Sequence, residues 1–152
     1  MEYSHKDADL VDQPVGYWTW AANKTLLAYA RGRLAAIGVT QPQWWVLHQV
    51  LHAEDGATRA EVITAQQANL DVGAGGLAPD VDLLVERKLL VQDADGRLRL
   101  TDEGRALHRR AAETQRANRE RVHADVSDEE YLIALKVLQR MIHNAGGDVS
   151  RP

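Results

Sequence analysis

The sequence predicts a mainly α-helical protein with one small β-hairpin. Apolar residues recur every three to four positions over several long stretches, which is the spacing of an amphipathic helix. Three stretches begin with Ser or Thr followed three residues later by Gln or Glu, a pattern that caps helix N-termini. One Asp-Gly pair lies between two short apolar runs and favours a tight hairpin. A chain of 152 residues suits one domain with helical extensions.

The first three helices follow from apolar spacing and caps. The first is expected over Val15–Ile37 and ends at Gly38, a residue type favoured just after a helix C-terminus. The second begins after Thr40, the first capping residue, and ends before Asp55. The third is short, starts at the second capping pattern and covers about residues 58–69.

The fourth helix is expected to start late, near Pro79. Three glycines precede it within residues 73–76, and each costs about 1 kcal/mol relative to alanine inside a helix. Proline is tolerated in a first turn but interrupts a helix interior. Residues 89–92 and 97–100 then form the two strands of the hairpin, with the Asp-Gly pair in its turn.

Two more helices complete the predicted order. One covers about residues 101–122, and its first turn carries acids that suit the positive end of a helix dipole. The other starts at the third capping pattern and covers about residues 127–142. We expect residues 14–145 to form a single unit between flexible tails at 1–13 and 146–152.

Composition excludes several classes of protein. The chain has no cysteine, which removes disulfides, cysteine nucleophiles and thiolate metal sites. No stretch approaches the roughly 20 apolar residues of a membrane span, and residues 1–13 are acidic, unlike a signal peptide. We therefore expect a cytoplasmic protein. No catalytic triad, phosphate-binding loop or dinucleotide motif is present, so an enzyme is not expected.

Two histidines have the spacing of metal ligands. His48 and His52 lie four residues apart on one predicted helix, as do the ligands of His-Glu-x-x-His sites. Neither that glutamate nor a cysteine is present to complete a site. We interpret both residues as histidines of a helix surface and expect neither metal nor cofactor.

The order of elements is helix, helix, short helix, helix, hairpin, long helix. This is the order of a winged helix-turn-helix domain flanked by N- and C-terminal helices. From Val81 through the hairpin to Arg105 the sequence resembles the MarR (multiple antibiotic resistance regulator) family of transcription regulators, and the Leu-Thr-x-x-Gly run that ends at Gly104 is the most specific part. The run Thr40–Leu47 is similar to the start of the family's second helix. The resemblance covers about residues 15–145.

The resemblance implies a homodimer that binds double-stranded DNA. The dimer interface would come from the helices at about 15–37 and 102–144, and the winged helix, at about 39–101, would meet the DNA. The family reads bases with the helix that follows Leu70, where this chain has glycines and alanines without side-chain hydrogen bonds for base edges. Its wing is also longer than the turn at Asp95.

The charge distribution indicates where DNA would be held. The net charge of −4 divides into −6 over residues 53–86 and +4 over residues 87–121, with the remainder near balance. We expect arginines around the reading helix to contact phosphates; the alternative for the wing arginines is that they are solvated strand residues. The candidate DNA-binding residues are Arg59, Gly73, Ala74, Gly75, Gly76, Arg97, Arg99 and Arg105.

Aromatic residues suggest an effector site. The chain has four tryptophans and no phenylalanine, and the tryptophans form two close pairs in the first two helices. In the family, small aromatic or phenolic effectors bind where the dimer helices meet the winged domain. The candidate effector-binding residues are Trp18, Tyr29, Arg33, Trp44, Trp45 and His48. The alternative is that the aromatic residues form the core of the dimer interface.

These observations lead to one leading hypothesis and one alternative. The leading hypothesis is a homodimeric DNA-binding transcription regulator, a repressor released by a small aromatic effector. The alternative is a winged-helix dimer that has lost sequence-specific DNA binding and serves as a protein-interaction or small-molecule-binding module. The acidic, glycine-rich segment 70–82 distinguishes the two.

Overall fold

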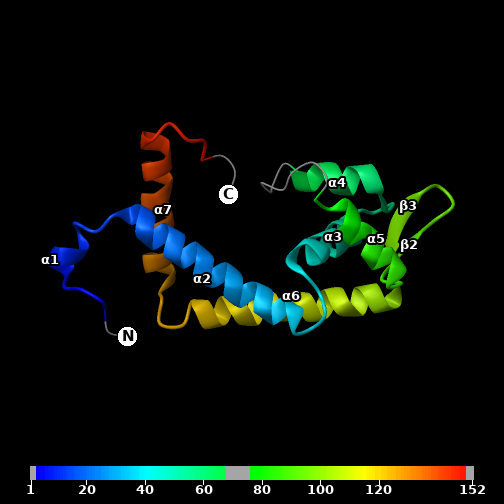
Figure 1. The fold of residues 1–152 in the computed structure, drawn as a ribbon, viewed down its shortest axis with the longest axis horizontal. Helices are drawn as coiled ribbons and strands as arrows, with labels where there is room; N and C mark the ends of the chain where they lie inside the picture. Colours follow the sequence, from blue (N-terminus) through cyan, green and yellow to red (C-terminus); the bar gives the residue numbers. More distant parts are fainter. Residues whose placement is uncertain (1–2, 68–75, 150–152) are drawn as a thin grey trace. The chain divides into compact units, whose positions relative to one another are not determined.

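The computed structural model describes residues 3–67 and 76–149 of the chain (Figure 1). The chain divides into two compact units, residues 1–116 and residues 117–152. The first unit contains the sheet and most of the helices, and the long helix α6 (Asp102–Val122) passes from the first unit into the second.

The first unit begins with three helices: α1 (Asp7–Leu10), α2 (Val15–Ala35) and α3 (Gln41–His52). The single turn α1 lies in the segment that we expected to be a tail. Helix α2 ends two residues before the expected Ile37, and Gly38 closes the following turn in the left-handed conformation at a φ of 78°. At α3, the Thr40 hydroxyl accepts a hydrogen bond from the Gln43 backbone N–H, and the Gln43 side chain accepts one from the Thr40 backbone N–H.

The winged part of this unit contains five elements: β1 (Ala57–Thr58), α4 (Arg59–Gln67), α5 (Ala78–Glu86), β2 (Leu90–Gln92) and β3 (Arg97–Leu100). The strands form one antiparallel sheet in the order β1-β3-β2. Ala57 pairs with Leu98, and Leu90 pairs with Leu100. Figure 1 shows the β2–β3 hairpin extending beyond the helices that pack behind it.

One hydrophobic core holds the winged part together. It joins α3, α4, α5, the sheet and the first half of α6, and its fully buried side chains include Leu47, Leu84, Leu90 and Leu107. Leu34 near the end of α2 is also fully buried, so the start of the winged part is anchored to that helix. The burial of such side chains contributes roughly 1.5–3 kcal/mol each.

The second unit contains the end of α6 and helix α7 (Asp128–Asn144). Asp125 takes the left-handed conformation at a φ of 61° in the turn between them. The Ser127 side chain then caps α7 by accepting from the Glu130 backbone N–H. No residue of α7 is fully buried. Among the described residues, no helix has the length and apolar character that crossing a membrane requires.

The predicted fold class is confirmed. All three capping patterns form as expected, including the one in which Thr58 and Glu61 exchange hydrogen bonds. The start of α5 at Ala78 agrees with the late start expected near Pro79. Strand β1 was not predicted, because its two residues are too few to show the alternation that marks a strand.

Candidate DNA-binding and effector sites

Arg59 joins the two helices of the helix-turn-helix. From the first turn of α4 its guanidinium donates two hydrogen bonds to the carboxylate of Asp82 on α5, one of them from Nη2 to Oδ2 at 2.8 Å. The same Nη2 donates to the Ala78 carbonyl at 3.2 Å. The hydrogen bond from Arg59 lowers the pKa of Asp82. This candidate phosphate contact is therefore engaged inside the chain, although both side chains stay partly exposed.

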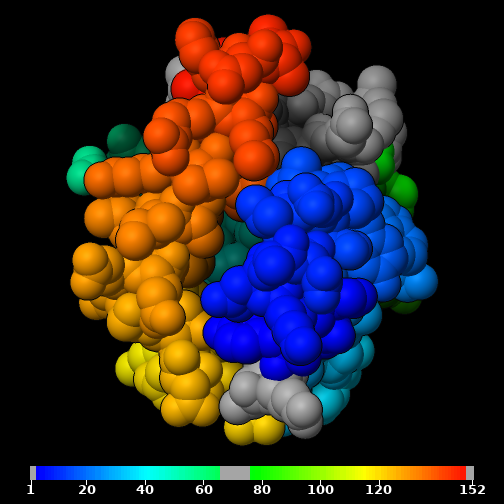
Figure 2. Space-filling view, turned by 90° about the vertical axis from the view of Figure 1, so that its left-hand side faces the viewer, coloured from blue at the N-terminus to red at the C-terminus, as the bar shows by residue number. Residues whose placement is uncertain are grey.

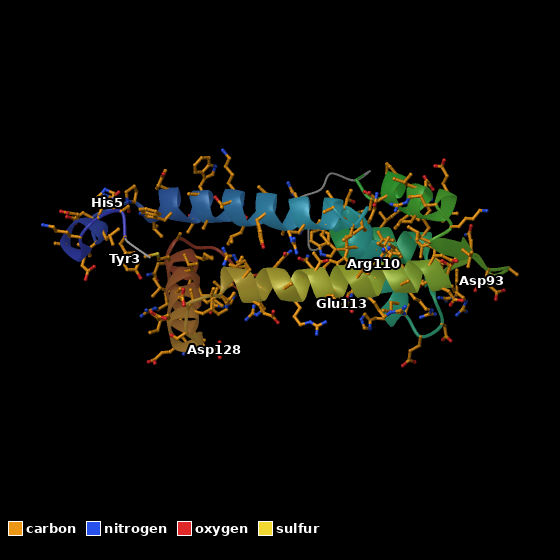
Figure 3. The ribbon with its side chains drawn as sticks, turned by 90° about the horizontal axis from the view of Figure 1, so that it is seen from below. Tyr3, His5, Asp93, Arg110, Glu113 and Asp128 are labelled. Carbon is orange, nitrogen blue, oxygen red and sulfur yellow. The ribbon has the colours of Figure 1, made fainter. Side chains whose placement is uncertain are left out.

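Asp93 organises the turn of the wing (Figure 3). One oxygen of its carboxylate accepts hydrogen bonds from the backbone N–H groups of Asp95 and Arg97, at 3.1 and 2.9 Å. The other oxygen accepts from Nε of Arg99 at 2.9 Å. These hydrogen bonds, first that of the Arg97 backbone, lower the pKa of Asp93. Gly96 completes the turn at a φ of 77°, a conformation that glycine adopts at little cost.

The wing arginines also reach the loop before β1. Nη1 of Arg97 donates to the Gly56 carbonyl at 2.8 Å and lies 3.8 Å from the Glu61 carboxylate. Nη2 of Arg99 donates to the Asp55 carbonyl at 3.0 Å. The two side chains therefore brace the hairpin against β1. Both stay partly exposed, so their outer faces remain open to a phosphate.

Arg105 differs from the other three candidate arginines. It lies in the first turns of α6 and is exposed, and its guanidinium makes no hydrogen bond or ion pair within the described part of the chain. Gly76 lies in the turn before α5 and is also exposed. Gly73, Ala74 and Gly75 lie outside the described residues.

The start of α6 is fixed to β2 by the Leu-Thr-x-x-Gly run. The Thr101 hydroxyl donates to the Lys88 carbonyl at 2.8 Å and accepts from the Gly104 backbone N–H at 3.0 Å. The Thr101 backbone N–H donates to the Leu89 carbonyl at 3.2 Å. Arg105 follows in the first turn of α6, where its backbone N–H donates to the Thr101 carbonyl at 2.9 Å.

The structure brings two of the six candidate effector residues into contact. The rings of Trp44 and His48 on α3 have centroids 5.5 Å apart. The indole Nε1 of Trp44 is buried and has no hydrogen-bond partner in the described residues. Trp45, next along α3, is half-buried. Three candidates are exposed on α2: Trp18, which contacts Tyr17 edge to face at 5.3 Å, Tyr29 and Arg33.

His48 lies against His108 of α6, a contact that the sequence does not predict. His48 Nδ1 and His108 Nε2 of α6 are 3.1 Å apart, and the His52 ring centroid lies 4.3 Å from that of His48. His108 is only 8% exposed. Burial, and then the neighbouring histidines, lower the pKa of His48 and of His108. Both effects favour the neutral form of these two rings.

A hollow of about 470 Å³ lies beside α6. Arg110 and Glu113, labelled in Figure 3, line it together with Ile37, Arg87, Leu89, Glu103, Ala106, Leu107 and Arg109. None of the six candidate effector residues lines this hollow. Arg87 is held in place by a 2.8 Å hydrogen bond from its Nη2 to the Gly38 carbonyl.

These elements define a winged helix-turn-helix protein with long flanking helices. No protein-family model matches the sequence, and a search of curated proteins gave no match. Solved structures do match.

A Mycobacterium tuberculosis MarR family protein in complex with DNA aligns with a TM-score of 0.66 and 22% identity, over 86% of this chain and 98% of its own. A MarR family transcriptional regulator from Silicibacter pomeroyi aligns with a TM-score of 0.68 and 18% identity, over 93% of this chain and 99% of its own. The transcriptional repressor CouR bound to p-coumaroyl-CoA aligns with a TM-score of 0.66 and 23% identity, over 90% of this chain and 96% of its own. At these identities the likeness establishes a shared fold, and the chain has the fold of MarR family regulators.

Proposed function

We propose that the chain is a DNA-binding transcription regulator that acts as a homodimer and represses its target. The observation that carries this proposal is the winged helix-turn-helix of α4, α5 and the β2–β3 hairpin, a fold shared with a protein solved in complex with DNA. CouR, of the same fold, is a transcriptional repressor. Such a role needs no catalytic group.

We expect the affinity for DNA to come from phosphate contacts of arginines rather than from contacts with bases. Arg105 is free to meet a phosphate, and Arg97 and Arg99 present partly exposed guanidinium groups on the wing. The acids Asp80 and Asp82 on α5 repel phosphates. We also expect direct readout of bases by this helix to be weak. A binding titration by fluorescence anisotropy, with the chain's own upstream region and a scrambled duplex of equal composition, tests this. Absence of binding to both at low salt would contradict the proposal.

The homodimer is supported by large apolar side chains that stay exposed on α7 and α2. On α7 the exposed ones include Leu132, Leu135, Met141 and Ile142, and Figure 2 shows this helix, in orange, at the surface. Trp18, Trp20 and Leu26 are exposed on α2. Exposed apolar surface of this kind is characteristic of interfaces. Light scattering coupled to size exclusion measures the mass directly; a monomer at micromolar concentration would contradict the dimer.

We propose further that a small aromatic effector causes the protein to release DNA. The residues expected to bind this effector are Trp18, Tyr29, Arg33, Trp44, Trp45 and His48. The buried Nε1 of Trp44 without a partner supports a ligand that supplies an acceptor there. A structure of the same fold holds an aromatic acyl thioester, p-coumaroyl-CoA. Tryptophan emission and melting temperature should both change with aromatic acids, whereas aromatic residues of a dimer core would respond to neither.

A second candidate function is a winged-helix dimer that has lost sequence-specific DNA binding and recognises a protein or a small molecule. Two observations favour this second candidate. Arg59 pairs with Asp82, and the wing arginines pair with acids and carbonyls of the same chain. Equal affinity for the upstream region and for the scrambled duplex, with a dimer that binds an aromatic acid, would select this candidate.

A further inference from the structure

Three histidines from two helices gather at the junction of α3 and α6. His48 and His52 extend from α3, and His108 extends from the first half of α6. His48 lies between the other two, 3.1 Å from His108 between ring nitrogens and 4.3 Å from His52 between ring centroids. All three residues belong to the first compact unit.

We propose that His48 and His108, completed by His52, bind a divalent transition-metal ion. Two nitrogen ligands of a tetrahedral zinc ion, each about 2.0–2.1 Å from the metal, lie about 3.3 Å from one another. The observed 3.1 Å between His48 Nδ1 and His108 Nε2 is close to this value. To share an ion, the two nitrogens would move slightly apart and both rings would turn so that a lone pair of each points at the metal.

His52 supplies the third ligand. As the structure stands, no three His, Cys, Asp or Glu side chains among the described residues are arranged to hold a metal. His52 is exposed, so its ring is free to rotate toward the pair. It stands four residues from His48 on the same helix, which is the spacing that lets two imidazoles of one helix share a metal. Water would fill the remaining position.

The surroundings suit metal binding rather than a buried structural contact. A neutral imidazole is the form that binds metal. Imidazole ligands select zinc, nickel, copper and iron over magnesium or calcium. His48 is exposed, which gives an ion access. A bound ion would link α3 of the winged part to α6, independently of whether the protein binds DNA.

Isothermal titration of the untagged full-length chain with zinc chloride and with nickel chloride tests the proposal. We expect one ion per chain, and a loss of affinity of about 10–100-fold or more in His48→Gln and in His52→Gln, because removing a ligand costs at least as much as removing a residue that orients one. Both substitutions are at exposed positions, so folding should persist. His143→Gln is the matched control, since it removes an exposed histidine of α7 outside the cluster.

The visible spectrum of the cobalt-substituted protein gives a second readout. Absorption typical of tetrahedral nitrogen ligation should appear with the unsubstituted chain and disappear with His108→Gln. Three results would overturn the proposal: no binding, binding that His48→Gln and His52→Gln leave unchanged, or binding that His143→Gln abolishes. In the first case the 3.1 Å contact is a hydrogen bond between neutral imidazoles only.

Discussion

Gly104 lies directly against the backbone carbonyl of Leu89. A β-carbon added at position 104 would be 2.1 Å from that oxygen, far inside any permitted contact. The same carbonyl accepts a hydrogen bond from the Thr101 backbone N–H. The start of α6 and the start of β2 are therefore joined backbone to backbone, and the glycine of the Leu-Thr-x-x-Gly run is required by this close approach.

The first prediction is that Gly104→Ala destabilises the protein by about 1–3 kcal/mol or more, since overpacking against backbone forces α6 away from β2. Helix propensity alone predicts the opposite sign. Gly32→Ala in α2 is the control: a β-carbon there meets nothing within 4 Å, so it should stabilise by about 0.4–1 kcal/mol. Urea unfolding measures both. Equal stability of Gly104→Ala and the unsubstituted chain would show that the backbone contact is absent.

The second prediction concerns the pairing of Arg59 with Asp82. Asp82→Asn should raise DNA affinity and steepen its salt dependence by about 0.9 in log–log slope, because a released Arg59 can neutralise one more phosphate. Asp80→Asn removes the same charge from the same helix without releasing an arginine, so its salt slope should not change. Anisotropy titrations over a range of salt concentrations measure the slopes. Identical slopes in the two variants would mean that Arg59 does not reach DNA.

The third prediction assigns a phosphate contact to Arg105, which is exposed and has no partner in the described residues. Arg105→Ala should weaken binding to all duplexes alike and lower the salt slope by about 1. Arg105→Lys should retain most of the slope, because lysine contributes the same charge. A loss confined to one DNA sequence would instead indicate base recognition by Arg105.

The locally determined parts of the fold could be predicted from sequence, and the distant pairings could not. The caps at Thr40 and Ser127 depend on residues three positions away, so a short window contains the whole interaction. Arg59 and Asp82 are 23 residues apart, and His48 and His108 are 60 apart. Nothing in a window around either member indicates its partner. The sequence therefore predicted arginines for phosphate contacts but not that acids and carbonyls of the same chain engage three of them.

The fourth prediction is that the wing loses order in acid through Asp93. Its pKa is below the ordinary 3.8 because the Arg97 backbone N–H, and then Arg99, stabilise the carboxylate. A lowered folded-state pKa means that the contribution is complete above pH 3.8 and is lost as the pH falls through the lowered value. Below that pH the wing amides should therefore exchange faster relative to their intrinsic exchange rate, which means that their protection falls.

Two variants separate the parts of this contact. Asp93→Asn keeps an acceptor for the Arg97 N–H but removes the charge. It should therefore loosen the Arg99 side chain while the turn stays intact. Asp93→Ala removes both and should expose the turn amides at neutral pH. If Asp93→Ala protects these amides as well as the unsubstituted chain does, Asp93 does not organise the wing.

The fifth prediction tests the proposed dimer through α7. Leu135 is 39% exposed and Ile142 is 45% exposed, and residues seven apart lie on the same side of a helix. Leu135→Glu places a charge in this apolar stripe, so it should shift the population from dimer to monomer. Lys136→Glu introduces the same side chain at the adjacent position, about 100° around the helix, and should leave the dimer intact. Sedimentation at several concentrations measures both, and a dimer that tolerates Leu135→Glu as well as Lys136→Glu would exclude this stripe from the interface.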